Sequence, residues 1–194
     1  MTAQPIDPAP AGMWHPDPVR QRLADYTIED VLTLPDDAPR VELRDGVLVV
    51  VPSPTFGHQN IGNRLWAWFS QHGPEHLVVG TALGVAVSHR NTFEPDVVLL
   101  KAPVSGEHHY FDAEQVVLAV EVVSPGTRRR DRIEKPAGYA DAGIPHYWRI
   151  EQDPVHVYAY DLVDGRYELA ADSAEELIVS KPFDIRLRVR DIAP

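Results

Sequence analysis

Two acidic residues lie in segments of the sequence that are otherwise apolar. Asp96 follows Pro95 at the start of an apolar run, and Glu121 lies near the end of the run 116–123. An unpaired buried carboxylate is costly, so such a group is protonated, ion-paired or bound to a cation. Two carboxylates on neighbouring strands, with backbone carbonyls nearby, are the oxygen ligands that a hard cation such as Mg²⁺ prefers. The pattern therefore predicts a cation site.

A lysine follows these acids on a predicted helix over residues 127–142. Asp131, Lys135 and Tyr139 are spaced by four residues, so they lie on one face of that helix. A basic residue at this place can reach back to the end of the strand that carries Glu121. Pro136 disfavours α-helical backbone at the residue before it, so we expect the helix to restart or kink at Lys135.

Each of these residues also has a purely structural interpretation. Glu121 can pair with Lys135 or Arg128 and stabilise only the fold, because structural ion pairs are common. Pro95-Asp96 at a strand start is also ordinary turn chemistry. The residue types alone leave both interpretations open.

One dense run of basic residues comes shortly after Glu121 and consists of Arg128, Arg129, Arg130 and Arg132. Beside the candidate site, this run would contact phosphates. A solvated helix face is the alternative, although positive charge at a helix start opposes the helix dipole.

The remaining pattern predicts the elements that must position these residues. Helices are expected over 27–34, 55–72 and 127–142, the last capped by Thr127 and stopped by Gly143. Asp-Gly turns predict hairpins over 41–51 and 155–170, because they supply the positive φ angles of tight turns. Strand-like runs cover 77–88, 96–101, 116–123, 146–151 and 185–189. The order helix, three strands, helix, strand indicates an α/β (α+β) fold with a mixed sheet flanked by helices.

Length and composition bound the class of protein. The chain has 194 residues and no cysteine, which excludes disulfides, thiolate metal sites and a cysteine nucleophile. Residues 1–24 hold five prolines and lack hydrophobic periodicity, so we expect a mostly disordered arm, followed by one domain over 25–194. The longest apolar runs have five residues and the N-terminus lacks a secretory signal pattern, so we expect a cytoplasmic protein without a membrane segment. A net charge of −11 argues against a surface that grips nucleic acid throughout, but permits a local basic cleft.

The acids and the lysine resemble a known nuclease pattern. Pro95-Asp96 followed by Glu121-Val122-Val123 resembles the Pro-Asp…(Asp/Glu)-x-Lys signature, with Val123 in the lysine position. The surrounding sequence is similar to the Uma-two family of restriction-endonuclease-like proteins over roughly residues 25–190. The similar segments are 41–46, Ser53-Pro54 with His58, 94–97, 120–125, 127–132 with Glu134-Lys135 and Tyr139, and 142–148.

The resemblance implies a restriction-endonuclease-like core and a metal-dependent nuclease that hydrolyses phosphodiester bonds of DNA or RNA as a homodimer. Asp96, Glu121 and the carbonyl of Val122 would hold Mg²⁺ or Mn²⁺, and Lys135 would replace the missing strand lysine. Glu42 matches an acid of the family's hairpin and is expected as a third acidic site residue.

His58 is either a proton carrier, because its ordinary pKa lies near neutrality, or a polar residue at a helix start.

Two other functions remain open at this point. An inactive nucleic-acid-binding or regulatory module on the same fold is favoured by Val123 and by the acidic net charge. A hydrolase of small phosphates is disfavoured, because the sequence has no glycine-rich phosphate loop.

Overall fold

A mixed six-stranded sheet forms the centre of the molecule in the computed structural model, which describes residues 14–35, 37–126 and 128–194. The strand order is β11-β10-β9-β8-β6-β3, and within it only β8 and β9 pair in parallel. The strands are β3 (Leu77–Gly80), β6 (Val97–Lys101), β8 (Val116–Val122), β9 (His146–Gln152), β10 (Val155–Val163) and β11 (Arg166–Ser173). The predicted mixed sheet is confirmed.

The parallel pair follows from the helical crossover that joins β8 to β9. Parallel strands need such a crossover, whereas hairpins join antiparallel neighbours. The crossover contains a π-helical turn, η2 (Arg130–Glu134), followed by α4 (Lys135–Asp141). Pro136 has no N–H for an α-helical hydrogen bond, so the predicted change of backbone at Lys135 takes the form of this wider turn. The predicted cap Thr127 lies outside the described residues, and Gly143 ends the helix with φ +78°.

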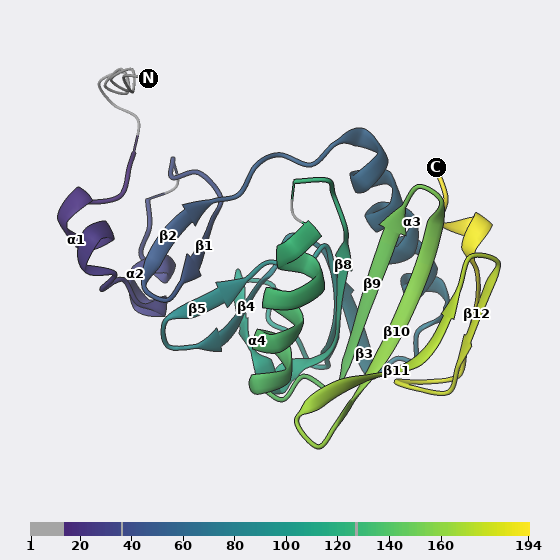
Figure 1. Cartoon of the computed structure of the whole chain (residues 1–194). Coiled ribbons are helices and arrows are strands. Elements are labelled where there is room, and N and C mark those ends of the chain that lie inside the picture. Colours follow the sequence, from purple (N-terminus) through teal and green to yellow (C-terminus); the bar gives the residue numbers. More distant parts are fainter. Residues whose placement is uncertain (1–13, 36, 127) are drawn as a thin grey trace, which may run out of the picture.

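The two longest predicted helices cover opposite faces of the sheet (Figure 1). From α3 (Phe56–His72), Ile61, Leu65 and Phe69 pack on the face that carries Val97. Tyr139 of α4 packs on the other face. Both faces of β6 and β8 are therefore buried, which explains why these strands read as continuous apolar runs.

Smaller sheets surround this core. The hairpin of β1 (Val41–Arg44) and β2 (Val47–Val50) turns at Asp45-Gly46, with φ +48° and +83°. Another hairpin joins β12 (Glu176–Val179) to β13 (Ile185–Arg188). A three-stranded sheet, β5-β4-β7, consists of β4 (Gly84–Ser88), β5 (Asn91–Phe93) and β7 (Tyr110–Asp112). Single 3₁₀ turns lie at η1 (Ala113–Gln115) and η3 (Val189–Asp191).

The described part of the N-terminal segment contains a short helix. Helix α1 (Pro18–Leu23) begins at an Asp17 cap, whose carboxylate accepts the N–H of Val19 at 2.7 Å. Gln21 bonds both the N–H and the carbonyl of Leu48, at 2.8 and 2.9 Å. In the structure a distant strand thus holds part of the segment for which a mostly disordered arm was expected, while residues 1–13 lie outside the described part.

The next helix matches its prediction more closely. Helix α2 (Ile28–Leu32) has the predicted capping box of Thr27 and Asp30, and it ends two residues earlier than expected. None of the helices in the described ranges is long and apolar enough to cross a membrane.

Candidate active site

Asp96 lies where β6 begins, next to the end of β8. Its N–H donates to the carbonyl of Val120 at 3.0 Å, and its Oδ2 accepts the N–H of Val122 at 2.7 Å. The side chain keeps 26% of its surface exposed. Asp96 is thus fixed by the backbone of β8 while its carboxylate still reaches solvent.

His58 contacts Asp96 from the first turn of α3. Its Nε2 lies 3.3 Å from Oδ2 of Asp96. Its main-chain N–H donates to Oγ1 of the cap residue Thr55 at 3.4 Å. Burial lowers the pKa of His58, but the hydrogen bond and the charge of Asp96 outweigh it, so the pKa is raised above its usual value. Protonation of His58 is therefore favoured by the neighbouring Asp96.

Glu121 lies in the sheet interior and is only 2% exposed. Both of its carboxylate oxygens lie 2.7 Å from Nζ of Lys135, and its Oε1 also accepts the hydroxyl of Tyr139 at 2.6 Å. Burial raises the pKa of Glu121, against the opposing charge of Lys135, and the charge of Asp96 raises it further. The structure thus brings together the acid and the lysine that the sequence placed on different elements.

Glu42 joins this cluster from the hairpin β1–β2. It is 1% exposed, its Oε1 accepts the N–H of Glu94 at 3.1 Å, and the same oxygen lies 3.6 Å from Nζ of Lys135. Its Oε2 pairs with the guanidinium of Arg130 and lies 3.5 Å from that of Arg44. The third predicted acid therefore faces three basic side chains.

The four arginines of the basic run do not share one surface. Arg130 turns inward against Glu42, and burial lowers its pKa. Arg132 pairs with an acid of β9 at 2.9 Å. Arg128 and Arg129 are exposed. The π-helical turn begins at Arg130, where the side chains change from exposed to inward-facing. Only part of the predicted phosphate-binding run therefore faces solvent.

Tyr139 is a site residue that the sequence interpretation placed on the right helix face without assigning it a role. Burial and the charge of Glu121 raise its pKa well above the usual value, so the hydroxyl remains a donor. The signal available in the sequence was its spacing of four residues from Lys135.

The carboxylates of Asp96 and Glu121 are oxygen ligands of the kind that a hard divalent cation prefers. Asp96 offers an accessible carboxylate, and Glu121 is close enough that the charge of Asp96 raises its pKa. The described residues contain no group of three or more acidic, histidine or cysteine side chains already gathered to hold a metal ion. A cation bound between the two acids would have to take one Glu121 oxygen from Lys135.

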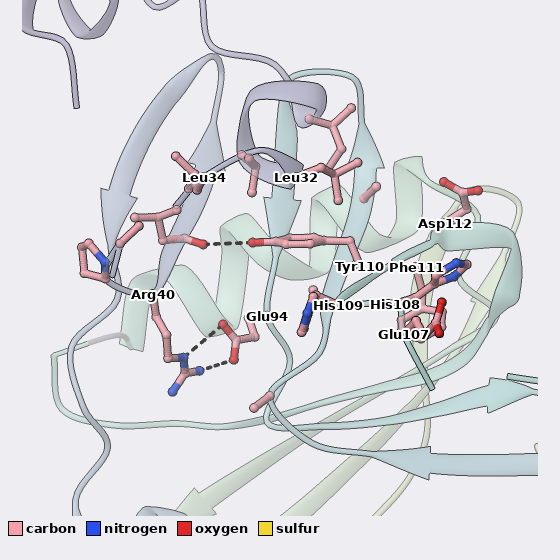
Figure 2. A pocket seen from close by; sticks show the side chains of 18 of the residues that line it. Leu32, Leu34, Arg40, Glu94, Glu107, His108, His109, Tyr110, Phe111 and Asp112 are labelled. Atoms are coloured by element: carbon pink, nitrogen blue, oxygen red, sulfur yellow. Dashed lines mark hydrogen bonds and ion pairs between the residues drawn. The ribbon is translucent and has the colours of Figure 1, made fainter. Parts of the chain in front are cut away.

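Glu94 separates this cluster from a groove of about 780 Å³. Its main-chain carbonyl lies 3.3 Å from Nζ of Lys135, whereas its side chain lines the groove and pairs with Arg40 (Figure 2). Tyr110 extends across the same groove toward the carbonyl of Val41. The described residues that line this groove do not include the candidate catalytic residues Asp96, Glu121, Lys135, Glu42 and His58.

Comparisons with known proteins agree with the fold. A crystal structure described as "a putative nuclease belonging to DUF820 from Anabaena variabilis ATCC 29413" matches with a TM-score of 0.67 and 19% sequence identity, covering 86% of this chain and 96% of that chain. No curated protein matches the sequence. The sequence profile of the Uma2 family, described as "Putative restriction endonuclease", matches residues 28–190. The chain therefore belongs to the Uma2 family.

Proposed function

We propose that the protein is a metal-dependent endonuclease that hydrolyses phosphodiester bonds of DNA. Family and fold support a nuclease in general terms. The observation that carries the proposal is the contact of Lys135 with Glu121, at 2.7 Å to both oxygens. The buried Val123 occupies the lysine position of the strand. The positively charged side chain beside Glu121 therefore comes from Lys135 at the start of α4.

The side chains of the cluster have distinct roles in this reaction. Asp96, Glu121 and the carbonyl of Val122 would hold Mg²⁺ or Mn²⁺, which would polarise a phosphate and lower the pKa of bound water. The ammonium group of Lys135 stabilises negative charge that develops on the phosphate or positions the attacking water. His58, whose Nε2 lies 3.3 Å from Oδ2 of Asp96, can move a proton to or from the reacting oxygens.

An inactive binding module on the same fold is the second candidate. The specific observation in its favour is that protein donors already occupy both oxygens of Glu121. An ion pair of this kind is also what a purely structural role would require.

Cleavage of supercoiled plasmid separates the two candidates. Purified protein is incubated with Mg²⁺, Mn²⁺ or chelator, together with Asp96→Asn, Lys135→Met and the control Lys181→Met, whose side chain is 66% exposed. We expect metal-dependent nicking that falls at least about a hundredfold in the first two variants and is unchanged in the control. Nicking that persists in Asp96→Asn would exclude the proposed site, and no cleavage by folded wild-type protein would favour the binding module.

We also propose that two copies of the chain act together, so that two sites face the two strands of DNA. This part rests on the fold alone. Light scattering after size-exclusion chromatography tests it, because a dimer has twice the mass of one chain.

A further inference from the structure

Glu121 is held unequally at its two oxygens. Oε1 accepts both the hydroxyl of Tyr139 at 2.6 Å and Nζ of Lys135 at 2.7 Å, whereas Oε2 is bonded by Lys135 at 2.7 Å. The carboxylate is nearly inaccessible to solvent, at 2% exposure. Its orientation therefore depends on these two side chains.

The two donors differ in how easily they can leave. Lys135 has other acceptors within reach, the carbonyl of Glu94 at 3.3 Å and Oε1 of Glu42 at 3.6 Å. Its ammonium can turn toward these groups and stay paired when a cation approaches Oε2.

Tyr139 has no such freedom. Its ring is fully buried, with an edge-on contact to Phe93 at a centroid distance of 5.3 Å and a tilted contact to Tyr147 at 6.0 Å. A tyrosine packed in this way cannot swing its hydroxyl away from Glu121 without disturbing the core.

We propose that Tyr139 is a positioning residue that anchors Oε1 of Glu121 and so presents Oε2 to the divalent cation of the site. The inference rests on the proposed nuclease function. A hydrogen bond from outside the ligand set fixes a ligand's orientation, and its loss commonly weakens metal binding about 10- to 100-fold.

Manganese titration of the full chain tests the role directly. Free Mn²⁺ is measured by electron paramagnetic resonance for wild type, Tyr139→Phe and the matched control Tyr147→Phe. Tyr147 lies in the same core, but its hydroxyl donates to the carbonyl of Asp131 instead of to Glu121. We expect Mn²⁺ to bind Tyr139→Phe about 10- to 100-fold more weakly than wild type, and the control to bind within a few-fold of it.

Each other outcome has a defined meaning. Wild-type affinity in Tyr139→Phe would overturn the inference, as would an equal loss in both variants, which would indicate a general effect of loosening the core. Absence of Mn²⁺ binding by wild type would instead refute the proposed metal site itself.

A second variant keeps the test decisive if Tyr139→Phe does not fold. Lys135→Met removes the other donor to Glu121, and the inference expects this variant still to bind Mn²⁺, with displacement of the proton that Glu121 holds in the metal-free variant, because Tyr139 remains. Loss of Mn²⁺ binding by folded Lys135→Met at both pH 7 and pH 8 would mean that Lys135 positions the carboxylate, and would overturn the assignment.

Discussion

In the absence of a bound cation, removing Lys135 should leave Glu121 as a buried carboxyl group that is compatible with the folded state only when it is protonated. Lys135→Met deletes the charge that opposes the raised pKa of Glu121, while the burial that raises this pKa remains. The double variant Glu121→Gln/Lys135→Met has the same core without an ionisable group at this place. The difference in unfolding free energy between the two variants therefore isolates the cost of keeping Glu121 neutral.

The size of that difference follows from the ordinary pKa of the carboxyl group. The unfolded chain ionises Glu121 with a pKa of 4.5. At pH 7 the folded single variant must hold a proton across about 2.5 pH units, at about 1.36 kcal/mol each, or about 3.4 kcal/mol in all. Because the folded pKa lies above the unfolded one, this stability is present below pH 4.5 and is lost as pH rises. The single variant should match the double variant near pH 4.5 and lose about 1.4 kcal/mol per pH unit above it.

Urea unfolding followed by circular dichroism at pH 4.5, 6 and 7 measures this directly. The exposed Lys181→Met serves as the control and should stay within about 0.5 kcal/mol of wild type. A difference below about 1 kcal/mol at pH 7, without a slope in pH, would show that Glu121 is solvated and that the buried pair does not exist in solution.

Three further outcomes test other parts of the structure. Glu42→Gln leaves the guanidinium of Arg130 buried beside a neutral group, so a loss of roughly 3 kcal/mol is expected, seen as a thermal midpoint lower by about 6–12 °C. The hydrogen bond from an arginine of α1 lowers the pKa of Asp30 to about 2, below its unfolded value of 3.8. The stability that ionised Asp30 contributes to the fold is therefore present above pH 4 and lost toward pH 2. Asp30→Asn should remove this acid dependence from the amide hydrogen exchange of α2. Gly138→Ala places a Cβ 2.5 Å from a ring of β5 and should cost about 1–3 kcal/mol, whereas Gly62→Ala meets its nearest atom at 3.9 Å and should be neutral or stabilise by up to about 1 kcal/mol, as measured by urea unfolding.

Local patterns in the sequence were sufficient to predict the main helices and strands of the core. The Asp45-Gly46 turn, the helical spacing over 55–72 and the apolar runs around Asp96 and Glu121 each correspond to an element of the structure. The short distance along the chain from Glu121 to Lys135 also allowed their contact to be expected, because one crossover joins them.

Features that depend on distant contacts could not be predicted. Strand β7 is three residues long and pairs with β4 through Gly84 and Tyr110, far apart in sequence and without strand alternation. The inward turn of Arg130 follows from a π-helical turn and from Glu42, which arrives from another element. Tyr139 acquires its role only because the core places its hydroxyl on Glu121.

The hairpin that carries Glu42 is separated in sequence from the rest of the charged cluster. Residues 52–55, which are neither helix nor strand, connect this hairpin to α3. A hydrogen bond from the N–H of Leu43 to the hydroxyl of Thr92, at 2.9 Å, holds β1 to the core. A chain broken within 52–55 would yield two fragments, and neither would contain every acid of the site. Fusing the two fragments to interacting partners would therefore make assembly of the complete set of acids depend on that interaction.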